Sequence, residues 1–235
     1  MSAAVRARPR AHPVRRWAWG HPEWWVVGLA GAAWAGLTAG SLVLGDHMGH
    51  GDGPSWRTVA MVAAMMLPLV VPHVRFVVGS SLWRRRVASV AWFIAGYFGL
   101  WVLVQVGLEV GWSWASPALG ATGAAVAVAV AALWEVSDGQ SRRQGRCHRL
   151  ARLAPWGWRA DAACARYGAA TGVRCVAVCW PAMLMCAAFS HGLIVMAFVF
   201  GVQLSGRYRA DAPPWWRSVA LVVTGAIGLA TGDLL

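Results

Sequence analysis

Charged residues are scarce in this chain. They make up 13% of its 235 residues, whereas 58% are hydrophobic. Soluble domains carry about 25% charged residues, so this composition excludes a soluble domain and favours an integral membrane protein. Lysine and asparagine are absent altogether, and all 21 basic residues are arginine. A GC-rich genome produces such a bias, which by itself carries no functional signal.

Several catalytic signatures are missing as well. The chain has no G-x-x-x-x-G-K-[ST] phosphate loop, so it is not expected to hydrolyse ATP. It has neither the His-Glu-x-x-His zinc signature nor a G-x-S-x-G nucleophile turn, so neither an intramembrane protease nor an esterase is supported. Its few carboxylates, including Glu109, Glu135 and Asp138, fall at the ends of apolar runs, which argues against a carboxylate proton relay. We therefore expect a protein that is not an enzyme.

Long apolar runs fill most of the sequence, and most have the length of about 20 residues that a transmembrane helix needs. The fifth run is too long for one ordinary span and breaks at Ser190-His191-Gly192, so we expect a tight helical hairpin there. The runs are Trp24–Leu44, Thr58–Val78, Val87–Leu108, Ala115–Trp134, Val173–Ser205 and Trp215–Leu235.

These runs predict an all-α, polytopic membrane helical bundle with about seven transmembrane segments, or six if 173–205 forms one helix. A basic N-terminal tail (1–23) would precede a single membrane domain (24–235), which includes a cytoplasmic loop at 135–172.

The arginines indicate the orientation. If the turn at 190–192 lies on the far side, 19 of the 21 arginines fall on one face, and only Arg57 and Arg75 lie elsewhere. The positive-inside rule makes that face the cytoplasm, so the N-terminus is expected inside and the C-terminus outside. The net charge of +12 is then an orientation signal in a lipid bilayer, and no nucleic-acid partner is expected.

Four sulfur-containing residues share one face of a predicted helix. They stand at positions i, i+4, i+8 and i+11, and are Cys175, Cys179, Met183 and Cys186. Thiolate and thioether ligands select Cu(I) and other soft metals, so this face predicts a metal site. The alternative is that these side chains only pack between helices.

A second helix offers further ligands. Met61 and Met65 share a face with Pro68 and Pro72, and Met66 and His73 lie on the neighbouring face. The prolines free backbone carbonyls, which is tolerated in a membrane where neighbours satisfy them. Antiparallel packing of the two helices would place Met61 near Cys186 and His73 near Cys175.

Together these motifs resemble a bacterial family of predicted metal-binding integral membrane proteins, some of which are labelled copper chaperones. The resemblance covers about 56–205 and depends on Met61-x-x-x-Met65-Met66-x-Pro68 and on Arg166-x-Gly168-x-x-x-Gly172-x-x-Cys175-x-x-x-Cys179-Trp180-x-x-Met183. It implies a multi-span fold in the bacterial inner membrane and a link to metal. Two positions differ from the family pattern, Ala151 in place of a cysteine and Ser190-His191-Gly192 in place of a methionine-containing turn. His191 is chemically able to substitute as a ligand.

A glycine-rich loop between the first two spans carries His47 and His50, which are suited to capturing copper or zinc. We therefore predict a Cu(I)-binding membrane protein for copper transfer or transport, with an unidentified protein partner or a second copy of the chain as a further partner. The alternatives are a membrane thiol-redox protein that uses Cys175 and Cys179, and a structural membrane subunit. The candidate ligands are Met61, Met65, Met66, His73, Cys175, Cys179, Met183, Cys186, His47, His50 and His191.

Overall fold

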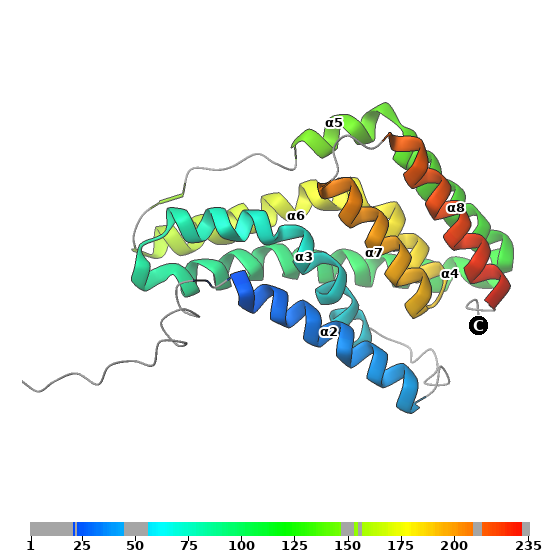
Figure 1. The fold of residues 1–235 in the computed structure, drawn as a ribbon, viewed down its shortest axis with the longest axis horizontal. Helices are drawn as coiled ribbons and strands as arrows, with labels where there is room; N and C mark the ends of the chain where they lie inside the picture. The colour runs from blue at the N-terminus through cyan, green and yellow to red at the C-terminus, as the bar shows by residue number, and fades with distance from the viewer. Residues whose placement is uncertain are drawn as a thin grey trace, which may run out of the picture.

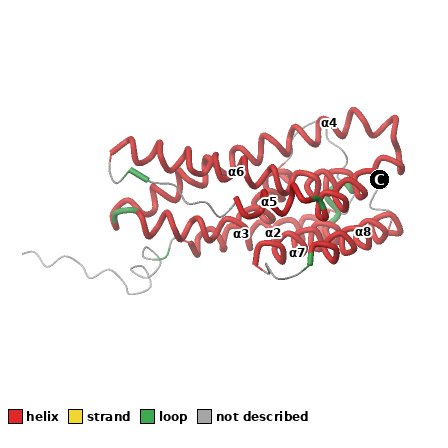
Figure 2. The backbone as a smooth tube through the Cα atoms, turned by 90° about the horizontal axis from the view of Figure 1, so that it is seen from above, coloured by secondary structure: helices red, strands yellow, loops and turns green. Residues whose placement is uncertain are grey.

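The structure, a computed structural model, describes residues 21, 23–44, 56–146, 153–154, 157–208 and 213–231. These residues form helices and short connections, and no strand occurs among them (Figure 2). The prediction of an all-α helical bundle is confirmed. The elements are α2 (Glu23–Leu44), α3 (Trp56–Ser80), η1 (Trp83–Arg85), α4 (Arg86–Val136), α5 (Asp138–Arg146), α6 (Gly157–Ala188), α7 (Leu193–Tyr208) and α8 (Pro214–Thr231).

Four helical segments of the described chain are long and apolar enough to cross a membrane: Glu23–Leu42, Trp56–Ser80, Trp83–Gly120 and Gly157–Ala188. Three shorter apolar helices accompany them, at Thr122–Val136, Leu193–Tyr208 and Trp215–Ala230. The described residues thus contain as many apolar helices as predicted, although only four have the full length of a span.

The predicted break between α6 and α7 is present. Ser190 and His191 have positive φ angles of 48° and 61°, so the chain leaves the right-handed helix there. The alternative of one helix over 173–205 is therefore wrong. α6 begins at Gly157, so residues 157–172, which we expected in a loop, form the first half of the cysteine-bearing helix.

The expected boundary between the third and fourth spans is wrong. Instead of a loop between Leu108 and Ala115, α4 continues as a helix until Gly120, whose φ of 50° and ψ of −142° interrupt it. The polar residues near Glu109 suggested a helix end, but they are accommodated by contacts with other segments, described below. Glycine supplies the break because it adopts positive φ without a steric penalty.

α4 and α6 pack with their backbones in direct contact. A Cβ atom at Gly96 would lie 2.2 Å from the carbonyl oxygen of Ala165, and one at Gly168 would lie 2.0 Å from that of Phe93. Small residues permit this close approach between apolar helices. Figure 1 shows α6 running along α4, with α2 against α3 and α8 beside the last part of α4.

Two prolines inside helices leave carbonyl groups without their usual helical donor. Pro68 frees the carbonyl of Ala64, which accepts a hydrogen bond of 3.1 Å from Trp34 Nε1 of α2. Pro181 frees the carbonyl of Ala177, which accepts one of 3.4 Å from Arg143 of α5. Neighbouring helices thus satisfy both groups.

Candidate metal centre

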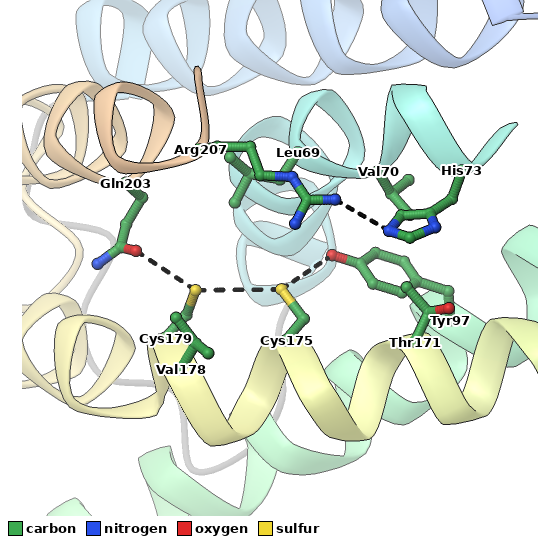
Figure 3. A pocket seen from close by; sticks show the side chains of 10 residues that line it. All are labelled: Leu69, Val70, His73, Tyr97, Thr171, Cys175, Val178, Cys179, Gln203 and Arg207. Carbon is green, nitrogen blue, oxygen red and sulfur yellow. Dashed lines mark hydrogen bonds between the residues drawn. The ribbon is translucent and has the colours of Figure 1, made fainter. Parts of the chain in front are cut away.

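A cavity with a largely apolar lining and a few polar side chains lies between α3, α4, α6 and α7 (Figure 3). Its volume is about 40 Å³, counted as the space open to the centre of a water molecule. A single water needs about 10–15 Å³ on this measure, so the cavity has room for a metal ion and a small ligand. It is lined by Leu69, Val70, His73, Tyr97, Thr171, Cys175, Val178, Cys179, Gln203 and Arg207.

Two cysteines of α6 present their sulfur atoms to this cavity. Cys175 Sγ and Cys179 Sγ are 4.0 Å apart, because residues at i and i+4 lie one helical turn apart on the same face. With metal–thiolate bonds of about 2.3 Å, an ion bridging this distance would have a sulfur–metal–sulfur angle of about 120°. That angle leaves a third coordination position open. The pair therefore fits a soft ion of low coordination number.

Tyr97 of α4 connects Cys175 to α3. Its hydroxyl lies 3.4 Å from Cys175 Sγ and 3.3 Å from the carbonyl oxygen of Met66, and it is positioned to donate to either. Donation to sulfur would stabilise Cys175 as a thiolate, because a hydrogen bond to the charged form favours it. The thiolate is the form that binds a metal.

The ring nitrogens of His73 are both engaged in hydrogen bonds. The Arg207 guanidinium donates to His73 Nε2 at 2.9 Å, so Nδ1 carries the proton and donates to the Tyr167 hydroxyl at 2.8 Å. This assignment follows from the fact that an arginine can only donate. His73 thus lines the cavity, but it could ligate a metal only after displacing Arg207.

Arg207 brings a positive charge into a cavity that no carboxylate of the described residues lines. Its Nε is buried and has no hydrogen-bond partner among the described residues. Arg207 as a whole is half-buried, and a charge that is partly removed from water is stabilised by a counter-charge nearby. The cavity is therefore suited to an occupant with negative charge.

A chain of polar contacts leads away from Cys179. Its thiol donates to Gln203 Oε1 at 3.3 Å, and Gln203 Nε2 donates to Glu135 Oε1 at the same distance. Glu135 in turn forms an ion pair of 3.3 Å with Arg217 of α8. Although Glu135 stands at the end of an apolar run, it is only 2% exposed. Its partners lie far away in the sequence.

Of the predicted ligands, the structure brings only His73, Cys175 and Cys179 to this cavity. The other sulfur residues, none of which lines it, are fully buried in the hydrophobic core: Met61, Met65, Met66, Met183 and Cys186. His191 lies in the turn between α6 and α7, in an ion pair with Glu109. His47 and His50 fall outside the described residues. Nowhere in the described chain do three or more His, Cys, Asp or Glu side chains form a cluster that could hold a metal.

The sequence analysis did not identify the cavity residues that hydrogen-bond to the predicted ligands, which are Tyr97, Gln203 and Arg207. One signal was available, because Gln203 and Arg207 stand four residues apart near the end of an apolar run and so share a helix face. Tyr97 gave no such signal, since a tyrosine in an apolar helix commonly packs in the core.

Comparison with known protein families gives independent information about the role of this chain. A family model described as PpoB2, copper chaperone, matches residues 55–231, which is most of the chain and includes every cavity residue. The chain belongs to this copper chaperone family. No curated protein and no solved structure matches it. The family is not an enzyme class, and its description supports a copper-related role. The two thiols of the cavity have the ligand chemistry that copper in its Cu(I) state prefers.

Proposed function

We propose that this PpoB2-family protein is a membrane copper chaperone that holds Cu(I) between Cys175 and Cys179 and transfers it to a partner. The observation that carries the proposal is the pair of thiols, 4.0 Å apart and facing a cavity that is also lined by His73, Gln203 and Arg207. Thiolates select Cu(I) over hard cations. Two protein ligands leave a coordination position open, through which a ligand of the partner can take over the ion.

The charges of the cavity support this occupant. Cu(I) bound by two thiolates carries a net charge of −1, and the Arg207 guanidinium carries +1. Both groups face the same small cavity, so loading with copper would neutralise it. In a site shielded from water, such a match of charges is worth far more than at an exposed surface.

We further propose that the protein spans the bacterial inner membrane with its N-terminus in the cytoplasm. The four long apolar helices and the distribution of the arginines support this orientation. The buried sulfur residues of the core, Met61, Met65, Met66, Met183 and Cys186, would then supply weak soft ligands between the α6–α7 turn and the cavity. Weak ligation at several sites is what passage of an ion requires.

Replacing both cavity cysteines tests the proposal. Serine keeps the size of cysteine but offers a hard oxygen, so Cys175→Ser/Cys179→Ser should weaken Cu(I) binding by roughly 100-fold, which corresponds to about 2.7 kcal/mol. Competition of the purified protein with a chromophoric Cu(I) chelator measures this affinity. Cys164→Ser is the matched control, because Cys164 is buried on the same helix but does not line the cavity. Unchanged Cu(I) affinity in the double variant would refute the site.

The role of Arg207 gives a second test. Arg207→Met removes the positive charge and keeps most of the side-chain length, so the bound anionic complex loses its counter-charge. We expect Cu(I) affinity to fall roughly tenfold, or about 1.4 kcal/mol, in the same chelator competition. Arg75→Met serves as the control, since it removes the same charge from an exposed position outside the cavity. Equal affinities of the two variants would show that Arg207 does not balance the charge of the complex.

A further inference from the structure

A second polar cluster lies at the opposite end of α6 from its start, beside the turn that joins α6 to α7. It combines Thr58 of α3, Gln105 and Glu109 of α4, and His191 of the turn. Glu109 is at its centre: its Oε2 accepts a hydrogen bond of 2.8 Å from Thr58, and its Oε1 lies 3.2 Å from both Gln105 Nε2 and His191 Nε2. None of the four residues lines the cysteine cavity.

One side of the cluster is buried in the protein, and the other side is partly exposed. Gln105 is fully buried and Thr58 is 4% exposed, whereas the side chains of Glu109 and His191 are 20% and 24% exposed. A solvated ion could therefore reach the carboxylate and the imidazole, while the buried amide and hydroxyl hold the far side in place.

The hydrogen bonds within this cluster leave one polar atom unsatisfied. Gln105 Oε1 is buried and has no hydrogen-bond partner among the described residues. In addition, His191 Nε2 lies 3.2 Å from the acceptor Glu109 Oε1 and 3.4 Å from the donor Gln105 Nε2. One ring nitrogen cannot donate to the first and accept from the second at once.

A cation resolves both problems. The oxygen and nitrogen of a glutamine amide are distinguished by their partners and not by their shape, so rotation of the Gln105 amide by half a turn would point its oxygen at the cluster. Gln105 Oε1, Glu109 Oε1 and His191 Nε2 would then form a triangle with sides of 3.2, 3.2 and 3.4 Å. A point near the middle of that triangle lies about 2 Å from all three atoms, which is the length of a metal bond to nitrogen or oxygen.

The backbone holds His191 in this position. Ser190 and His191 both adopt the left-handed conformation, which is uncommon for residues other than glycine. The His191 N–H donates to the Cys186 carbonyl at 2.9 Å and so fixes the turn to the end of α6. The imidazole is thereby directed at Glu109 across the gap between α4 and the turn.

We propose that Gln105, Glu109 and His191 form a second metal site, with the Thr58 hydroxyl orienting the carboxylate. One imidazole, one carboxylate and one amide oxygen are ligands for a divalent transition-metal ion of borderline hardness, Cu(II) or Zn(II). The cysteine pair has the opposite preference. This site does not depend on copper binding in the cavity.

An ordinary ion pair between a histidine and a glutamate would also show the 3.2 Å contact. The chain contains such a pair for comparison: His21 Nδ1 and Glu23 Oε1 are 3.3 Å apart, and the side chain of His21 is 49% exposed. Substitutions at the two pairs can therefore be compared to distinguish metal binding at His191 and Glu109 from simple attraction between opposite charges.

The experiment uses the full-length protein in detergent micelles with Cys175→Ser, Cys179→Ser, His47→Gln and His50→Gln. These changes remove the two cavity thiols, which would reduce Cu(II), and the histidines of the first loop. Titration with Cu(II) is followed by electron paramagnetic resonance. We expect a signal from one ion coupled to a single nitrogen, and Zn(II) should displace it. Glu109→Gln and His191→Gln should each weaken binding at least tenfold, whereas His21→Gln should leave it unchanged.

A thermal-shift measurement shows whether a loss of binding comes from a loss of the fold. Zn(II) should raise the melting temperature of the starting protein and should not raise that of Glu109→Gln, provided that both melt cooperatively without metal. If Glu109→Gln destroys the fold, Gln105→Leu takes its place, because it removes only the amide group. This variant should bind Cu(II) more weakly than the starting protein does. Binding that survives Glu109→Gln or Gln105→Leu, or that is lost in His21→Gln, would overturn the second site. Because the cavity thiols are absent throughout, this result is separate from the outcome of the Cu(I) test.

Discussion

Replacing Gly168 with valine is expected to abolish the folded bundle, because no space exists for a side chain at this position. A Cβ atom there would lie 2.0 Å from the carbonyl oxygen of Phe93 and 3.0 Å from the backbone nitrogen of Tyr97. Both neighbours are backbone atoms of α4 and cannot rotate away. The helices would have to separate, so we expect the free energy of unfolding to fall by about 4 kcal/mol or more. Unfolding of the purified protein with SDS measures the change.

Gly99→Val is the matched control, since Gly99 lies on α4 and a Cβ atom there would have no heavy atom of a neighbouring segment within 4 Å. Its effect should not exceed about 1 kcal/mol, the scale of differences in helix propensity. Wild-type stability in Gly168→Val would contradict the direct backbone contact between α4 and α6.

Gly168 also matters for the site. Gly168, Gly172, Cys175 and Cys179 stand at i, i+4, i+7 and i+11, so the glycines that contact α4 continue into the face that carries the cysteines. The close approach brings Tyr97 within 3.4 Å of Cys175 Sγ. A residue larger than glycine would therefore disturb the candidate metal centre as well as the packing.

Local sequence patterns predicted the features that depend on neighbouring residues. The spacing of Cys175 and Cys179 placed both thiols on one face of a helix, and the Ser190-His191-Gly192 segment marked the end of α6. Helical periodicity and backbone preferences act over a few residues, so a single sequence reveals them.

Features that depend on distant partners could not be predicted in this way. The helix α4 continues past Glu109 because Thr58 and His191 accommodate the carboxylate, and these contacts join residues 51 and 82 positions away. Glu135 is buried because Arg217 and Gln203 surround it, and both lie in later helices. Only the folded structure brings such groups together.

The methionines of the core are compatible with two roles. Met61, Met65 and Met183 are fully buried in the hydrophobic core, a position that suits thioethers both as packing groups and as soft ligands. Their role as transient ligands stays a prediction, separate from the thiols of the cavity.

Arg217→Met is expected to destabilise the protein strongly, because it leaves the Glu135 carboxylate without its cation. The two side chains form an ion pair of 3.3 Å and are only 9% and 3% exposed. Removal of one partner of a buried ion pair costs about 3–5 kcal/mol, since the remaining charge stays in a poorly solvated place. The loss should appear as a lower free energy of unfolding in SDS.

The double variant Glu135→Gln/Arg217→Met should recover most of this stability, because the uncompensated charge is gone. The amide oxygen introduced at position 135 can still accept the hydrogen bond from Gln203 Nε2, which keeps Gln203 Oε1 directed at Cys179. Cu(I) affinity should therefore stay within a few-fold of wild type in the double variant. Arg85→Met is the control, as its ion pair with Asp161 is about 30% exposed and should contribute no more than about 1 kcal/mol. Equal losses in Arg85→Met and Arg217→Met would mean that Glu135 is solvated in the folded protein. Its role in orienting Gln203 against Cys179, the proposed copper ligand, would then have to be abandoned.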